Sequence, residues 1–313
     1  MATVVVAEFM DEAALARHLG DVDVRYDPDL VDRPEELHAA LADARGLIVR
    51  NRTQVRGALL DAAPKLEVVG RLGVGLDNID RAACKARGIA VQPATGANDL
   101  AVAEWVVTSA MLLLRGAYGA SGDVAAGRWP RERLVGREFA HKTLGLVGYG
   151  AIARETARRA LALGASVVAY DPFVAADDPA WQLATGTVRP VDFDALLAGS
   201  DVVSLHVPLT DATRGLIGAD ALALMKPGAI LLNAARGGIV DEAALARALG
   251  AGKLGGAGLD VFESEPLDAK AGARFAGLDN VLLTPHVAGV TVESNSRVSE
   301  VIAAAVARRR RRG

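Results

Sequence analysis

The sequence is poor in cysteine, aromatic residues and net charge, and each shortage excludes a class of protein. The single cysteine among 313 residues, Cys84, cannot form an internal disulfide or a thiolate metal cluster, so we expect no metal and a reducing, cytoplasmic compartment. Aromatic residues make up only 4%, which suits aliphatic strands covered by helices better than an aromatic-rich β-sandwich. The formal net charge of −3 argues against a nucleic-acid partner. No uncharged apolar run reaches the roughly 20 residues of a membrane helix, and the apolar start of the chain has no basic flank, so we expect neither a membrane partner nor a signal peptide.

Short apolar runs alternate with longer amphipathic stretches along most of the chain. This alternation is typical of βαβ units, in which helices cover both faces of a parallel sheet. The pattern runs once through the first third of the chain and starts again near residue 142. It therefore predicts an α/β fold with two Rossmann-like, doubly wound parallel-sheet domains and a cleft between them. The expected strands are 3–7, 21–26, 46–49, 67–70 and 89–92 in the first series, and 142–147, 166–170, 201–205, 229–233, 254–259 and 281–284 in the second.

The chain passes between the two predicted domains at two places. Proline, threonine, glycine and asparagine cluster at 93–98, and a long helix is expected from 99 to about 115. We expect a final helix over 291–307 to return to the first series. The predicted domains are therefore residues 1–97 plus 288–313, and residues 98–287. The run Arg308–Arg312 is expected to be a solvated helix end.

One glycine-rich turn predicts a dinucleotide site. An expected strand runs into Gly148-x-Gly150-x-x-Ala153, and a helix pattern follows. Gly148 permits the tight turn, Gly150 lets the backbone approach a pyrophosphate, and Ala153 keeps helix and strand close. The next strand ends at Asp171, near the offset of a carboxylate that binds the adenosine ribose. Since Asp171 would repel a 2′-phosphate and no arginine follows it, the sequence favours NAD over NADP.

Three further segments each follow an expected strand of the second series, where ligands bind in open α/β sheets. They contain Arg236 in Asn-Ala-Ala-Arg-Gly-Gly, Glu265 in Glu-Ser-Glu-Pro, and His286 in Thr-Pro-His-Val-Ala-Gly. Together with Arg-Leu-Gly-Val-Gly at 71–75, this order of motifs resembles the D-isomer-specific 2-hydroxyacid dehydrogenases over nearly the whole chain. That family transfers a hydride between a nicotinamide and a small 2-hydroxy acid or 2-oxo acid.

The resemblance implies a role for each residue. His286 would take the hydroxyl proton as hydride leaves the carbon, because imidazole titrates near neutrality. Glu265 would hydrogen-bond the other ring nitrogen and stabilise the imidazolium, and Arg236 would hold the substrate carboxylate. The implied NAD-binding residues are Gly148, Gly150, Ala151, Ile152, Asp171, Val207, Pro208, Ala234, Ala235, Asp260, His286, Ala288 and Gly289. The implied substrate-binding residues are Asn51, Arg52, Arg71, Val74, Gly75, Arg131 and Arg236.

The resemblance also bears on domains and substrate. It implies a flavodoxin-like substrate domain (1–97 plus 288–313), an NAD-binding Rossmann domain (98–287), and a dimerisation arm (99–140) in a homodimer. The arginines in 50–54, 71 and 131–133 resemble those of D-3-phosphoglycerate dehydrogenases, and the opening Ala-Glu-Phe-Met-Asp is similar to sulfolactate dehydrogenases of the family. We therefore expect a three-carbon 2-hydroxy acid with a second anionic group, 3-sulfolactate or 3-phosphoglycerate. Another substrate, glycerate or glyoxylate, stays open.

Two other functions are compatible with parts of this pattern. A formate dehydrogenase shares the architecture but pairs its histidine with glutamine, so Glu265 argues against it. An NAD-sensing transcriptional corepressor shares the fold and the motifs and would need a peptide-binding groove. His206, which follows an expected strand, either lines the adenine side of the cofactor site or is a core histidine.

Overall fold

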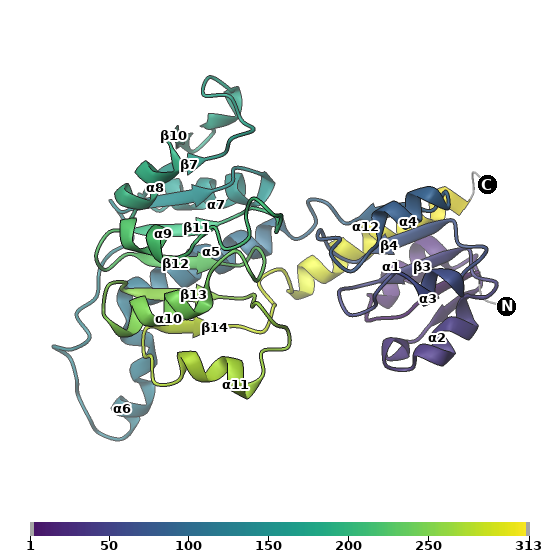
Figure 1. Ribbon diagram of the computed structural model, residues 1–313, viewed down its shortest axis with the longest axis horizontal. Coiled ribbons are helices and arrows are strands. Elements are labelled where there is room, and N and C mark those ends of the chain that lie inside the picture. Colours follow the sequence, from purple (N-terminus) through teal and green to yellow (C-terminus); the bar gives the residue numbers. More distant parts are fainter. Residues whose placement is uncertain (1–2, 311–313) are drawn as a thin grey trace. The chain divides into compact units, whose positions relative to one another are not determined.

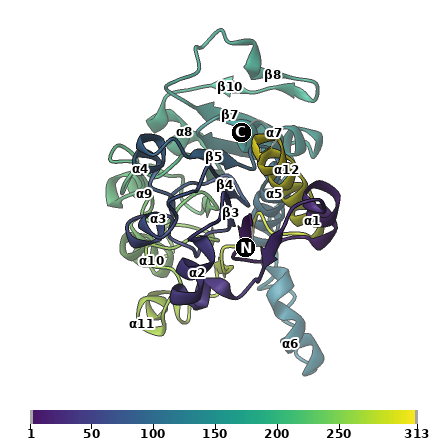
Figure 2. The same cartoon turned by 90° about the vertical axis from the view of Figure 1, so that its right-hand side faces the viewer.

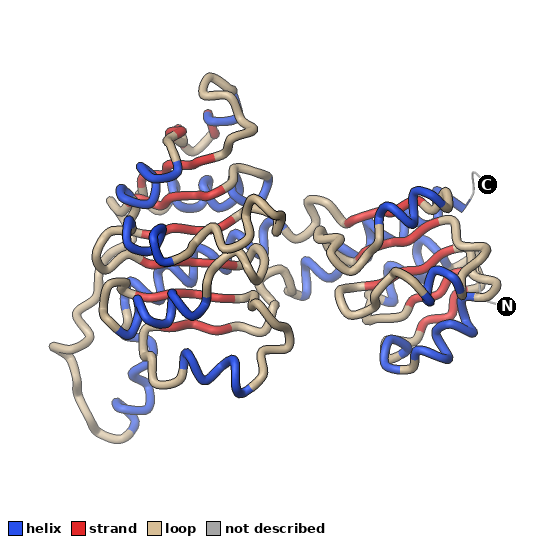
Figure 3. The backbone as a smooth tube through the Cα atoms, in the orientation of Figure 1, coloured by secondary structure: helices blue, strands red, loops and turns tan. Residues whose placement is uncertain are grey.

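The computed structural model describes residues 3–310, without the side chain of the last of these. The chain forms two compact units. Unit 1 comprises the described residues up to Asn98 and from Val290 onward, and unit 2 comprises Asp99–Gly289. The expected α/β class with two parallel-sheet domains is confirmed (Figures 1 and 3). Of the run Arg308–Arg312, the last two residues lie outside the described part.

Unit 1 is a five-stranded parallel sheet in the order β2-β1-β3-β4-β5, which is the flavodoxin-like order. Helices α1 and α12 cover one face of the sheet, and α2, α3 and α4 cover the other. Its strands are β1 (Val4–Val6), β2 (Val24–Tyr26), β3 (Gly46–Val49), β4 (Val68–Arg71) and β5 (Ala90–Pro93). Its helices are α1 (Glu12–Leu19), η1 (Leu30–Asp32), α2 (Pro34–Leu41), α3 (Ala58–Asp61), α4 (Arg81–Ala86) and α12 (Val292–Arg310).

The last helix completes the first unit. Ile302 and Val306 of α12 are buried against the sheet, in one core with α1. A Cβ at Gly70 on β4 would lie 2.5 Å from Ile302 Cγ2, so glycine permits the close approach of helix and strand here. Unit 1 is therefore discontinuous in sequence, as the helix pattern predicts.

Unit 2 is a seven-stranded parallel sheet in the order β10-β7-β6-β11-β12-β13-β14, the Rossmann order with one added strand. Helices α5 and α7 pack in the core on one face, and α8, α9 and α10 in the core on the other. Its strands are β6 (Thr143–Val147), β7 (Ser166–Tyr170), β10 (Arg189–Pro190), β11 (Val202–Leu205), β12 (Ile230–Asn233), β13 (Gly256–Leu259) and β14 (Val281–Leu283), with a hairpin of β8 (Gln182–Leu183) and β9 (Gly186–Thr187). Its helices are α5 (Asp99–Arg115), η2 (Ala117–Ala120), α6 (Ser121–Ala125), α7 (Ala151–Ala162), η3 (Pro179–Trp181), α8 (Phe193–Gly199), α9 (Ala219–Leu224), α10 (Glu242–Gly250), α11 (Ala269–Gly272) and η4 (Ala273–Phe275).

A segment between α5 and β6 extends away from the sheet of unit 2. Figures 1 and 2 both show α6 projecting from the body of the unit. The segment exposes large apolar side chains, namely those of Tyr118, Val124, Trp129 and Val135. Within residues 3–310, no single helix has the length and apolarity to cross a membrane; α5 and Ala117–Ala125 satisfy that test only as a pair, which is bent by 68°.

Candidate active site

The turn after β6 leaves space for a phosphate-bearing cofactor. Gly148 has φ +90°, and a Cβ there would lie 2.6 Å from the carbonyl oxygen of His206, so only glycine fits without strain. A Cβ at Gly150 would meet nothing within 4 Å, so the space beside this residue is open. Helix α7 begins at Ala151, and no side chain caps its first turn. Its free N–H groups therefore suit a pyrophosphate.

Asp171 is tied to this turn at the end of β7. Its Oδ2 accepts a hydrogen bond from Tyr149 N at 2.8 Å, and its Oδ1 accepts one from Phe173 N at 2.9 Å. Each carboxylate oxygen can accept a further bond, which a ribose hydroxyl would supply. The Tyr149 ring is fully buried and stacks on Trp181, with the ring centroids 4.3 Å apart. The stack anchors the turn to the hairpin region that follows β7.

His286 and Glu265 are in direct contact. His286 Nδ1 lies 2.7 Å from Glu265 Oε2, and Glu265 Oε1 accepts a hydrogen bond from Phe262 N at 3.1 Å. The side chains are 38% and 33% exposed, so solvent and a ligand can reach them. Burial opposes the charge of Glu265, but His286, the Phe262 N–H and Arg236 together outweigh burial and lower the pKa of this carboxyl. Glu265 is therefore ionised at neutral pH.

Asp260 holds the loop that carries His286. This carboxylate is 1% exposed and accepts hydrogen bonds from Thr284 Oγ1 (2.6 Å), Val287 N (2.8 Å) and Ala288 N (2.8 Å). His286 itself has φ +56°, a left-handed conformation that few side chains adopt without support. The contacts of Asp260 supply that support. The structure thus gives Asp260 a structural role, and its contact with the cofactor stays a prediction.

The Arg236 loop packs against the Glu265 loop. Asn233, buried at the end of β12, donates to Arg236 O and accepts from Ala235 N, so it shapes the turn before the arginine. A Cβ at Gly237 would overlap Phe262 O, so glycine is needed where the two loops meet. These contacts bring the charge of Arg236 close enough to Glu265 to lower its pKa.

A buried carboxylate joins the same two loops further along. Glu242, the first residue of α10, accepts a hydrogen bond from Glu263 N at 2.6 Å and pairs with Arg274 at 3.2 Å. In return, Glu242 N donates to Glu263 Oε1 at 3.3 Å. Burial raises the pKa of Glu242, and Arg274 partly offsets this effect. The reciprocal bonds fix the segment that ends in Glu265.

The other expected NAD-binding residues of unit 2 follow the carboxyl ends of the sheet strands. They are Ala151 and Ile152 after β6, Val207 and Pro208 after β11, Ala234 and Ala235 after β12, and Ala288 and Gly289 after β14. His206 lies beside the glycine turn, with its Nε2 3.0 Å from Ser204 Oγ. Burial lowers the pKa of His206 to about 4, so this imidazole is neutral at pH 7.

Most expected substrate-binding residues lie in unit 1: Asn51 and Arg52 after β3, Arg71 at the end of β4, and Val74 and Gly75 after β4. Arg52 is 56% exposed at its side chain and forms an ion pair with Asp32. Arg71 Nη1 donates to Leu72 O, and a Cβ at Gly73 would overlap this guanidinium, so Arg71 packs on the backbone of the loop that contains Val74 and Gly75. Asn51 is exposed between the two arginines of its loop. Arg131 belongs to unit 2, where it is exposed on the projecting segment.

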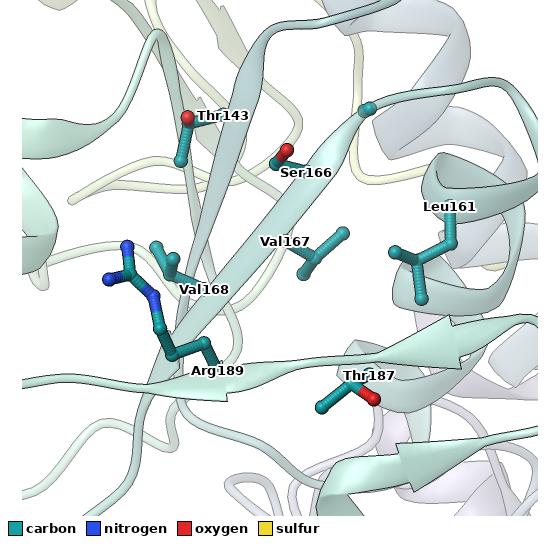
Figure 4. A pocket seen from close by; sticks show the side chains of 8 residues that line it. Thr143, Leu161, Ser166, Val167, Val168, Thr187 and Arg189 are labelled. Carbon is teal, nitrogen blue, oxygen red and sulfur yellow. The ribbon is translucent and has the colours of Figure 1, made fainter.

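Unit 2 also has a cavity of about 420 Å³, which is not lined by the glycine turn or by Arg236, Glu265 and His286 (Figure 4). Thr143 and Ser166, which line it, are the first residues of β6 and β7. The cavity therefore sits at the amino ends of these strands, whereas the glycine turn follows their carboxyl ends. No motif in the sequence marks Asn233 or Glu242 as residues that hold these loops; the one signal is that Asn233 is a polar residue at the end of an apolar strand.

Comparisons with known proteins agree with this geometry. A family profile described as "D-isomer specific 2-hydroxyacid dehydrogenase, NAD binding domain" matches residues 107–288. The chain is 54% identical over 299 residues to an (S)-sulfolactate dehydrogenase of Chromohalobacter salexigens, covering 96% of this chain and 95% of that one. It is 44% identical to a D-3-phosphoglycerate dehydrogenase of Archaeoglobus fulgidus, covering 86% of this chain and 50% of the relative.

A solved structure agrees as well. The crystal structure of D-lactate dehydrogenase from Aquifex aeolicus, complexed with NAD and lactic acid, superposes with a TM-score of 0.84 at 31% identity, over 97% of this chain and 94% of that one. The expected family, enzyme class and cofactor are thereby confirmed. The chain belongs to the D-isomer-specific 2-hydroxyacid dehydrogenases, a family of NAD-binding oxidoreductases.

Proposed function

We propose that His286 exchanges the proton of the substrate hydroxyl while Glu265 and Arg236 assist it. The observation that carries the proposal is the 2.7 Å contact between His286 Nδ1 and Glu265 Oε2. Since Nδ1 is committed to the carboxylate, Nε2 is the ring nitrogen that would meet the hydroxyl. Glu265 is ionised and would stabilise the imidazolium after His286 has taken the proton. Bound NAD supplies the acceptor or donor of the hydride.

The remaining positions would orient the two ligands. The Arg236 guanidinium is planar and suits a carboxylate through paired N–H donors. Unit 1 would add Arg71 and the backbone N–H groups of Val74 and Gly75. In unit 2, Asp171 would accept the adenosine ribose hydroxyls and disfavour a 2′-phosphate, so NAD is preferred to NADP.

The substrate that we propose is a three-carbon 2-hydroxy acid with a second anionic group, 3-sulfolactate or 3-phosphoglycerate. The support is the presence of Arg50 and Arg52 after β3 and of Arg71 at the end of β4, together with the names of the two relatives. Arg50 adds to this support. Its guanidinium lies 5.5 Å from the Phe9 ring centre, and its Nη2 donates to Asn295 Oδ1 at 2.5 Å, so the charge is held in place. The Arg52 guanidinium would have to break its ion pair with Asp32 in order to bind the substrate anion.

A substrate panel tests the proposal. The purified protein would be assayed at 340 nm, with NAD and with NADP, on 3-sulfolactate, 3-phosphoglycerate, D-lactate and D-glycerate. We expect kcat/KM to be at least about 10-fold higher for 3-sulfolactate or for 3-phosphoglycerate than for D-lactate, since a charge-assisted anion contact contributes about 1.5–3 kcal/mol. Equal efficiency on D-lactate would contradict the proposed substrate class.

We also propose a homodimer and a cytoplasmic location. The projecting segment between α5 and β6 exposes Tyr118, Val124, Trp129 and Val135, and exposed apolar side chains gathered on one segment favour an interface. Cys84 is buried and is the one cysteine of the sequence, so the fold depends on no internal disulfide, which suits a reducing compartment.

A further inference from the structure

A buried carboxylate in unit 1 organises the loop after β3. Glu8, two residues beyond the end of β1, is 4% exposed. Its Oε1 accepts hydrogen bonds from Arg50 N (2.8 Å) and Thr53 N (3.1 Å), and its Oε2 accepts one from Arg52 N (3.3 Å). One side chain therefore satisfies three backbone donors of a four-residue loop.

The carbonyl groups of the same loop are held by a second buried side chain. Asn78 Nδ2 donates to Arg50 O at 2.9 Å and to Thr53 O at 2.7 Å. Val55 N in turn donates to Asn78 O at 2.8 Å. Glu8 holds the donors of the loop and Asn78 holds its acceptors, so both fix the backbone from which the side chains of residues 50–53 extend.

This arrangement decides which groups of the loop can bind an anion. The N–H groups of Arg50, Arg52 and Thr53 already point at Glu8, so a substrate anion cannot use them. Recognition of an anion at this loop therefore falls to the side chains of Arg50, Asn51 and Arg52, and to the N–H of Asn51, which is not among the three donors that Glu8 binds. Their directions depend on a backbone that Glu8 determines.

We propose that Glu8 is a positioning residue for recognition of the second anionic group of the substrate: it fixes the Arg50–Thr53 loop and does not contact the substrate itself. The inference rests on the proposed function, because it takes the arginines of this loop to meet a sulfonate or phosphate. Glu8 would then govern the choice between substrates with and without that group. The carboxylate at C1 and the reacting carbon are assigned to other residues.

The test is the isosteric substitution Glu8→Gln. An amide keeps one acceptor oxygen, but its NH2 group would face a backbone N–H, so the loop loses part of its support. We expect KM for the preferred acid with two anionic groups to rise about 10-fold, which corresponds to about 1.4 kcal/mol, because the side chains of the loop lose part of their alignment. We expect kcat to stay within about 2-fold, and kcat/KM for D-lactate to change less than about 3-fold.

A matched control is Glu67→Gln, which removes the same charge from another residue of unit 1. Glu67 directly precedes β4 and pairs with Arg45 near the surface. It should leave the kinetics for both substrates unchanged. If Glu8→Gln does not fold, Glu8→Asp is the alternative, because aspartate keeps the carboxylate on a shorter side chain. This variant should lower the ratio of kcat/KM for the preferred acid to kcat/KM for D-lactate by a smaller factor.

The outcomes separate the inference from the function on which it rests. A wild-type protein without preference for a dianionic acid overturns the proposed substrate and the inference with it. A wild-type preference that survives unchanged in Glu8→Gln, or equal losses on both substrates, overturns the inference alone. A selective rise in KM for the dianionic acid supports it.

Discussion

Each unit has a position in its parallel sheet where the strand order reverses, and the residues that follow the first strand differ between the two units at this position. Strand order reverses between β1 and β3 in unit 1, and between β6 and β11 in unit 2. In unit 2 the first strand runs into Gly148 and Gly150, and the space beside Gly150 is open. In unit 1 the Glu8 carboxylate follows the first strand and takes three backbone N–H groups. The comparison teaches that a side chain of unit 1 occupies backbone N–H groups at this point, whereas unit 2 leaves the space beside its glycine turn open.

The largest effect should come from His286→Ala, because the proposed function places proton transfer on this residue of unit 2. We expect kcat to fall by about 10²- to 10⁴-fold, the usual contribution of a general acid–base residue. The dissociation constant of NADH, measured by fluorescence titration, should stay within about 3-fold. The matched variant in unit 1, Arg71→Ala, should mainly raise KM. An unchanged kcat in His286→Ala would remove this residue from proton transfer.

A smaller loss is expected from Gly150→Val. The valine side chain would occupy the open space beside the glycine turn of unit 2, in the same way as the Glu8 side chain occupies the corresponding position after β1 in unit 1. Since a Cβ at Gly150 meets nothing, the melting temperature should change little, but the side chain would occupy the space expected for the pyrophosphate. We expect the dissociation constant of NAD, measured by calorimetry, to rise about 10- to 100-fold. Gly199→Val, at the end of α8 and also without a neighbour within 4 Å, is the control and should bind NAD normally. Normal NAD binding by Gly150→Val would break the comparison.

The smallest effect should be that of lowered pH on the free energy of unfolding. Burial lowers the pKa of His206 from 6.5 to about 4, so between these values the unfolded chain binds a proton that the folded chain does not. The free energy of unfolding should therefore fall as the pH drops from 6.5 to 4, by about 3 kcal/mol at most from this residue. His206→Gln should flatten that slope, as measured by urea unfolding at several pH values. A slope identical to that of the wild type would show that another group is responsible.

The fold could be predicted because its determinants are local. Valine- and leucine-rich runs such as Val4–Val6 alternate with amphipathic helices, and glycine at 148 and 150 marks the turn between strand and helix. The contact of Glu265 with His286 follows from the family pattern, and the structure contains it. The strands of the hairpin β8–β9 have only two residues each, too few for an alternating pattern to be seen.

The pairings of buried polar groups could not be predicted, because they join residues far apart in the chain. Glu8 reaches a loop more than 40 residues away, and its place in the opening Ala-Glu-Phe-Met-Asp segment does not reveal which backbone groups its carboxylate binds. Arg52 was expected to bind substrate, and the sequence does not reveal that Asp32 already pairs with it. Asp260 was expected beside the cofactor, which stays a prediction, and the sequence does not reveal its three hydrogen bonds to the loop of His286.

The position of α12 has a consequence for how the protein is made. This helix packs on α1 and on the sheet of unit 1, yet it follows every element of unit 2 in the chain. During synthesis, the apolar face that α12 covers stays open to water while all of unit 2 emerges from the ribosome. Unit 2, which is continuous, can finish folding before α12 has emerged to complete unit 1, in contrast to the usual order in which amino-terminal domains mature first.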